Sequence, residues 1–159
     1  MCAILDANAA HEVFGANAGQ ATEAGEGFFQ WLKDGKGNLV VGGQLGEELD
    51  RVPGFRKWAY QAKLKGKPLL KISDYHVHDE TKKIEKRDDL KSNDPHVIAL
   101  AQVSGARLLF SNDKGLHEDF GNPEMINHPR GKIYSTLENK SFTEDKRKLL
   151  KRHRCRLGS

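Results

Sequence analysis

The sequence predicts a three-layer α/β/α fold with a central, mostly parallel sheet of four to five strands. Short apolar runs alternate along the chain with longer helical segments, which is typical of a parallel sheet covered by helices on both faces. The chain has 159 residues, enough for one domain with a hydrophobic core. Its apolar residues, 37% of the total, are clustered in these runs, and this clustering argues against a disordered chain.

Four apolar runs are the predicted strands. They are, in chain order, Cys2–Leu5, Leu39–Val41, Leu69–Ile72 and Arg107–Phe110. The second is β-branched in character, as strands prefer. Further edge strands are expected at Ile126 and at Lys132–Tyr134.

Helices are predicted between these strands from apolar spacing and from start and stop residues. Five of them cover Ala7–Phe14, Thr22–Leu32, Gln44–Arg51, Phe55–Leu64 and Lys114–Phe120. A sixth begins at Asp94-Pro95, an N-cap residue followed by proline, and ends at Gly105. The charged stretch His78–Leu90 is expected to be a surface helix or an extended insertion.

Charge divides the chain into two parts. Residues 140–159 hold eight basic and two acidic residues, a formal charge of +6, which leaves −2 for residues 1–139. We therefore expect one α/β domain over residues 1–139 and a basic C-terminal helix or tail over 140–159, with Thr143 as its cap. Such a tail attracts phosphates through counterion release, and a solvated terminal helix is the alternative.

The two cysteines, Cys2 and Cys155, have no metal-type spacing, so a reduced, cytoplasmic protein without a structural disulfide is expected. No segment is long and apolar enough to span a membrane, and the N-terminus lacks the basic region of a signal peptide.

Four acidic residues stand near the points where predicted strands end or helices begin: Asp6, Glu48, Asp94 and Asp113. Carboxylates in such positions can converge at one edge of a parallel sheet, and a cluster of oxygen ligands suits Mg²⁺ or Mn²⁺. Taken singly, Asp94 and Asp113 could be helix caps and Glu48 a solvated helix residue. Asp6 is harder to explain in this way, because it ends a strand expected at the buried centre of the sheet.

The segments that carry these acids resemble, in order and spacing, those of the PIN domain family. They are Ile4-Leu5-Asp6-Ala7-Asn8, then Leu39-Val40-Val41 leading to Glu48-Leu49, then Asn93-Asp94-Pro95-His96-Val97-Ile98-Ala99-Leu100-Ala101, and Leu108-Leu109-Phe110-Ser111-Asn112-Asp113. The resemblance covers residues 2 to about 136. The segments around Asp94 and Asp113 match most specifically.

The resemblance implies a metal-dependent nuclease, usually an endoribonuclease, and many small relatives are VapC-like toxins of toxin–antitoxin pairs. It makes Asp6, Glu48, Asp94 and Asp113 the catalytic residues and the ligands of Mg²⁺ or Mn²⁺. Glu48 is preferred to its neighbour Glu47 because Leu49 follows it. The implied partners are RNA, an antitoxin protein and a second copy of the chain.

The sequence departs from the family pattern at one position. Many relatives carry another acid two residues after the last aspartate, where this chain has Gly115. Asp119 is the candidate for an additional metal ligand. Ser111 and Asn112 could hold a carboxylate or a metal-bound water, or could merely form the turn, and Asn8 presents the same alternatives.

Basic residues are expected to hold the nucleic acid through its phosphates. The candidates are Lys91, Lys114, Arg130, Lys132, Arg147, Lys151, Arg152 and Arg154. Surface or capping roles are expected for the histidines, His96 included.

Two other functions compete with the nuclease. The first is a catalytically inactive PIN-like module that binds nucleic acid or protein, and Gly115 and the basic tail favour it. The second is a phosphatase or receiver domain, which also gathers acids around Mg²⁺. Asp6-Ala7-Asn8 lacks the second aspartate of a phosphatase Asp-x-Asp motif, which argues against the latter.

Overall fold

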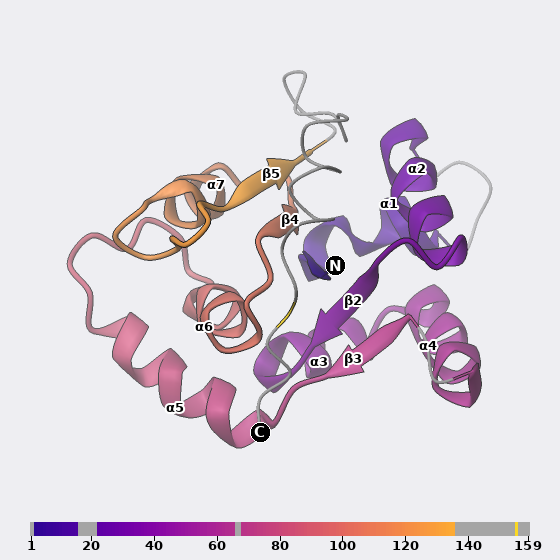
Figure 1. The fold of residues 1–159 in the computed structure, drawn as a ribbon, viewed down its shortest axis with the longest axis horizontal. Helices are drawn as coiled ribbons and strands as arrows, with labels where there is room; N and C mark the ends of the chain where they lie inside the picture. Colours follow the sequence, from indigo (N-terminus) through magenta and orange to yellow (C-terminus); the bar gives the residue numbers. More distant parts are fainter. Residues whose placement is uncertain (1, 16–21, 66–67, 136–154, 156–159) are drawn as a thin grey trace.

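A computed structural model describes residues 2–15, 22–65, 68–135 and 155, and it has one five-stranded, all-parallel sheet (Figure 1). The strands are β1 (Cys2–Leu5), β2 (Asn38–Val41), β3 (Leu69–Lys71), β4 (Leu108–Phe110) and β5 (Lys132–Tyr134). Their order across the sheet is β3-β2-β1-β4-β5. The strand β1 lies at the centre and is almost wholly buried.

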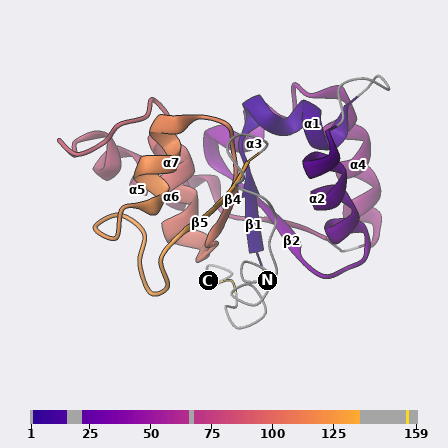
Figure 2. The same cartoon turned by 90° about the horizontal axis from the view of Figure 1, so that it is seen from above.

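Helices cover both faces of this sheet, which confirms the predicted α/β/α fold. Figure 2 shows α1 (Ala10–Phe14), α2 (Glu23–Lys33) and α4 (Pro53–Lys65) on one side, and α5 (Asp74–Glu85), α6 (Pro95–Ser104) and α7 (Lys114–Gly121) on the other. The short helix α3 (Gly43–Leu49) packs against α5 and α6, and a 3₁₀ turn, η1 (Ala7–Ala9), follows β1.

Local signals in the sequence account for several element boundaries. Thr22 caps α2, its side-chain oxygen accepting a hydrogen bond of 3.0 Å from the Gly25 amide. The helix α6 ends at Gly105. This residue has the left-handed conformation (φ 78°) that glycine adopts without a Cβ clash.

The first part of the charged stretch His78–Leu90, up to Glu85, forms a helix, and residues 86–90 form turns rather than a continuation of it. This helix begins at Asp74, earlier than predicted, and α5 buries Val77, Thr81 and Ile84 on one face. These three residues lie three to four positions apart, the spacing of one helix face.

The strand predicted at Ile126 is wrong. Ile126 lies in a turn segment between α7 and β5, and its side chain is fully buried. Its backbone amide donates a hydrogen bond of 2.9 Å to the Asn122 carbonyl, so it belongs to a local turn and pairs with no described strand. The predicted cap Thr143 lies outside the described residues.

The expectation of two free thiols is also wrong. Cys2 and Cys155 form a disulfide, with their Cα atoms 5.7 Å apart and 153 positions between them in sequence. Because Cys2 opens β1, the bond attaches Cys155 to the amino-terminal edge of the sheet. Within the described residues, no helix has the length and apolar character needed to cross a membrane.

Candidate functional site

The predicted acidic site lies at the point where the strand order of the sheet reverses. The chain runs outward from β1 through β2 to β3 and then returns to place β4 on the opposite side of β1. Leu5 is in register with Phe110, and the Asp6 amide donates to the Phe110 carbonyl at 2.9 Å. Asp6 and Ser111 therefore leave the sheet side by side, at the position where open α/β sheets bind ligands.

Ser111 joins two of the predicted acids. Its hydroxyl donates a hydrogen bond of 2.8 Å to Asp6 Oδ2, and the same oxygen accepts one of 3.1 Å from the Asp113 amide. Asp6 is 2% exposed and Ser111 is fully buried. The side chain of Ser111 thus both forms the turn and holds a carboxylate, the two roles that the sequence left open.

Asp94 and Asp113 both occupy N-cap positions but use their side chains differently. Asp113 Oδ1 accepts from the Leu116 amide at 3.2 Å and caps α7. Asp94 stands at the N-cap of α6 without any side-chain capping hydrogen bond. Its carboxylate is therefore not committed to its own helix.

Two of the acids, Asp6 and Asp94, have a raised pKa to which neighbouring acids contribute. Burial is the largest cause of the raised pKa of Asp6, and the charges of Asp94 and Asp113 raise it further, while the hydrogen bond from Ser111 opposes them. Burial also raises the pKa of Asp94, to which Asp113 and Glu48 add and which His96 opposes. Asp6 and Asp94 therefore each lie within the electrostatic reach of two other predicted acids.

Glu48 contacts a buried histidine of α6, His96. Its Oε1 lies 2.9 Å from His96 Nε2, and the two side chains are 27% and 3% exposed respectively. The contact has the distance of an ion pair but not the geometry of a hydrogen bond. Gln44 Nε2 donates to the same Glu48 oxygen at 3.0 Å.

The surface or capping role expected for His96 is therefore wrong. The sequence contained a signal for burial: His96 opens a helix whose next five residues are all apolar. A helix that is apolar on every side is buried, so a histidine in its first turn is buried with it.

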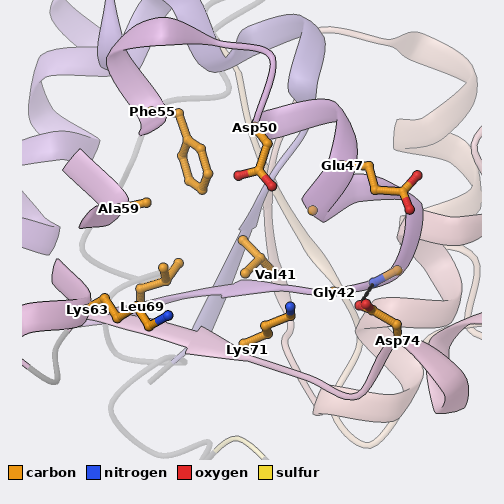
Figure 3. A pocket seen from close by; sticks show the side chains of 12 residues that line it. Val41, Gly42, Glu47, Asp50, Phe55, Ala59, Lys63, Leu69, Lys71 and Asp74 are labelled. Atoms are coloured by element: carbon orange, nitrogen blue, oxygen red, sulfur yellow. Dashed lines mark hydrogen bonds between the residues drawn. The ribbon is translucent and has the colours of Figure 1, made fainter. Parts of the chain in front are cut away.

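The neighbouring glutamates face different surroundings. Glu48 contacts His96 of α6, whereas Glu47 lines a pocket formed with β2, β3 and α4 (Figure 3). This geometry agrees with the preference for Glu48 as the acid of the site.

Packing explains why Gly115 carries no fifth acid. A Cβ atom at Gly115 would lie 3.0 Å from the Lys91 carbonyl oxygen and 3.3 Å from Asp113 Oδ1. Asp119, the candidate for the missing acid, has both side-chain oxygens engaged elsewhere. It is 1% exposed, and its two oxygens accept from the amides of Lys91 and Ser92, both at 2.8 Å. The metal role predicted for Asp119 is left without support, because it anchors the segment that precedes Asp94.

The remaining polar candidates of the turn segments are also placed. Asn112 donates to Glu12 Oε2 and accepts from the Ser135 hydroxyl, both at 2.6 Å, so it links α1 to the end of β5. Asn8 is exposed.

The predicted nucleic-acid contacts separate into three groups. Lys91 and Lys114 are exposed on the segments that hold Asp94 and Asp113. Arg130 donates to the Gly121 carbonyl at the far end of α7, and Lys132 opens β5, so both lie toward the opposite edge of the sheet. Arg147, Lys151, Arg152 and Arg154 lie outside the described residues.

The donor chemistry at this edge suits a hard divalent cation, since the candidate ligands are carboxylate oxygens. Across residues 2–15, 22–65, 68–135 and 155, however, no three His, Cys, Asp or Glu side chains are gathered as a ready metal site. A cation would have to draw the carboxylates closer together. No protein-family model, curated protein or solved structure matches the chain.

Proposed function

We propose that this protein is a metal-dependent endoribonuclease that hydrolyses RNA phosphodiester bonds with Mg²⁺ or Mn²⁺ at Asp6, Glu48, Asp94 and Asp113. The observation that supports this most is the placement of Asp6 and Asp113 on the shared Ser111 hydroxyl where the strand order reverses, with the pKa of Asp6 and of Asp94 raised by burial and by neighbouring carboxylates. A carboxylate whose pKa is raised by burial and by nearby carboxylates is stabilised in its ionised form by a bound cation. A bound divalent ion supplies a water of lowered pKa and neutralises charge on the phosphate.

The side chains around the acids would orient them for this role. Ser111 fixes Asp6, and the Leu116 amide fixes Asp113, while Asp94 remains free of its helix. Residues fixed by a second set of contacts hold a ligand geometry more precisely. Lys91 and Lys114 would contact the phosphates on either side.

The proposal is tested by an Asp6→Asn variant assayed on single-stranded RNA with Mn²⁺ or Mg²⁺. We expect cleavage to fall by at least about 100-fold, because metal catalysis contributes several kcal/mol and each 1.36 kcal/mol is a factor of ten. EDTA should stop the wild-type reaction. Asp88→Asn, an exposed acid on the segment after α5, is the control and should keep full activity. Equal activity of Asp6→Asn and wild type would refute the site.

A binding module without catalysis is the second candidate. The absence of a gathered metal site among the described residues and the glycine at position 115 favour it. Calorimetric titration with Mn²⁺ separates the two: metal binding that Asp6→Asn removes supports the enzyme. RNA binding without metal binding at millimolar Mn²⁺ supports the module. The antitoxin partner and the homodimer stay predictions of the family resemblance.

A further inference from the structure

A pocket of about 270 Å³ lies beside α3, at the carboxyl ends of β2 and β3 (Figure 3). Its apolar surface comes from Val41, Phe55 and Leu69, with Ala59 of α4 beside them. Ligand pockets are typically apolar cavities with a few placed polar groups, and this one is of a size for a single ring system.

Five charged side chains line this cavity: Glu47, Asp50, Lys63, Lys71 and Asp74. Three of them are acids and two are lysines, and the Asp74 carboxylate accepts a hydrogen bond from the Gly43 amide. No ion pair joins these acids to these lysines in the described part of the chain, although opposite charges share the same walls. In Figure 3, the Asp50 carboxylate points into the cavity from above, and the Lys71 ammonium group rises toward it from the other wall.

Glycines form one rigid side of the pocket. Gly43 has a φ of 58° and donates its amide to Asp74 Oδ1 at 2.8 Å. A Cβ there would lie 2.6 Å from Val77 Cγ1, so this turn requires glycine. Gly46 differs, because a Cβ at that position meets nothing within 4 Å and would extend into open space.

The pocket and the acidic site lie on two sides of one helix. Glu48 of α3 contacts His96, while Glu47 and Asp50 border the pocket. The strands β2 and β3 are one and two places from β1, about 5–10 Å along the same sheet edge at the usual strand spacing. An RNA strand with a phosphate at the acids would therefore bring a neighbouring base to the pocket.

We propose that this pocket binds a guanine base of the RNA, next to the phosphodiester held at the acidic site. This inference rests on the proposed nuclease function. A carboxylate only accepts hydrogen bonds, and guanine alone among the four bases presents two adjacent donors, N1–H and the N2 amino group, on its Watson–Crick edge. Asp50 accepts from both donors, the apolar wall covers the ring, and Lys63 and Lys71 face the adjoining phosphate.

Binding of 5′-GMP to the metal-free protein tests the pocket without relying on cleavage. Ligand-observed NMR should show GMP binding at least about tenfold more tightly than AMP, CMP or UMP, as a good bidentate contact provides. Asp50→Asn should remove this preference, because an amide offers one acceptor and one donor. Asp88→Asn should leave it unchanged. Equal binding of the four nucleotides, or a preference that survives Asp50→Asn, would overturn the proposal.

A second variant blocks the cavity without threatening the fold. Gly46→Leu places a side chain into the open space, and replacing glycine inside a helix favours helix formation. We expect loss of GMP binding with an unchanged or raised Tm. Gly121→Leu in α7 is the matched control, since its Cβ also meets nothing within 4 Å and it does not line the pocket. Undiminished GMP binding by Gly46→Leu would exclude the cavity as the base site.

Mapping the cleavage positions on RNA separates this inference from the nuclease proposal. If the wild type cleaves next to guanines and Asp50→Asn cleaves without regard to sequence, both the guanine pocket and the nuclease are supported. Cleavage with no base preference in the wild type refutes the guanine pocket and leaves the nuclease standing. Guanine-selective GMP binding in a protein that cleaves no RNA refutes the nuclease and leaves the base site standing.

Discussion

Asp94 and Asp113 occupy equivalent helix positions, yet only Asp113 caps its helix. A free carboxylate at the N-cap of α6 gives up a local hydrogen bond and stays close to Glu48 and Asp113. Its raised pKa is a cost that folding imposes on the ionised form. The ionised Asp94 carboxylate therefore lowers the stability of the fold, and it adds negative charge close to Glu48 and Asp113.

Replacing that charge should therefore stabilise the protein. Because the pKa of Asp94 is raised by folding, its contribution to stability is full below its ordinary value of 3.8 and is lost as the pH rises through the folded value. We expect Asp94→Asn to raise Tm at pH 7 and to have no effect below about pH 3.8, where both states are protonated. Thermal unfolding at several pH values measures this. An unchanged or lower Tm of Asp94→Asn at pH 7 would contradict this prediction.

Replacing Ser111 should lower the free energy of unfolding far more than replacing an exposed serine. Ser111→Ala removes the donor to a buried carboxylate and the acceptor of the Asp113 amide, so we expect a loss of about 1–3 kcal/mol in the free energy of unfolding. Urea denaturation is the measurement. Ser73→Ala is the control, since Ser73 is exposed and forms no side-chain cap bond. Similar losses in both variants would contradict the role given to Ser111.

For single residues, the position in the sequence predicted where the acids lie in the fold better than it predicted which side chains and amides they contact. The rule that parallel strands end at one edge was enough to bring Asp6 and Asp113 together. The contact of His96 with Glu48 depends on how α6 meets α3, and the bonds of Asp119 connect positions 27 and 28 apart. Such contacts come from tertiary packing, which local sequence does not encode.

At the level of elements, the segment between α5 and α6 is held by α7. The Lys91 and Ser92 amides both bond to Asp119, and the Lys91 carbonyl lies against Gly115. The segment leads directly to Asp94, so its position sets where α6 begins.

Releasing this anchor should loosen the segment without unfolding the domain. Asp119→Ala leaves the buried Ser92 amide without its acceptor, and we expect a cost of about 1–3 kcal/mol. Hydrogen exchange should become faster at the Lys91 and Ser92 amides. Asp119→Asn retains one acceptor oxygen and should give an intermediate effect. Unchanged protection of both amides in Asp119→Ala would refute the anchoring role.

Element boundaries were predictable where a local signal exists and not elsewhere. Thr22 and Gly105 mark the ends of helices through their own chemistry. Ile126 is buried like a strand residue but lies in a turn, because an apolar side chain reports burial and not backbone conformation. The sequence does not predict the start of α5 at Asp74, because most of the residues of this helix are charged or polar and only a narrow face, with Val77 and Ile84, is apolar.

For the whole molecule, the disulfide closes nearly the entire chain into one loop. Cysteine spacing could not reveal it, because the two partners stand 153 positions apart in sequence and are neighbours only in the folded chain. Long loops carry the largest closure entropy in the unfolded state.

The bond should accordingly stabilise the protein strongly. Chain entropy for a loop closed across 153 positions gives at most about 5 kcal/mol. We expect reductant to lower the urea midpoint of the wild type. Cys155→Ser should show the lower midpoint with or without reductant. A midpoint that reductant does not change in either protein would show that the bond adds no stability.

The central place of β1 also decides when the acidic site can form. The Ser111 hydroxyl that holds Asp6 lies 105 residues further along the chain. A protein emerging from the ribosome N-terminus first presents β1 with one edge unpaired until β4 has been synthesised. Contacts of such long sequence separation form slowly. The site is therefore assembled late, when β4 docks on β1, and no nascent chain shorter than 113 residues contains all four acids.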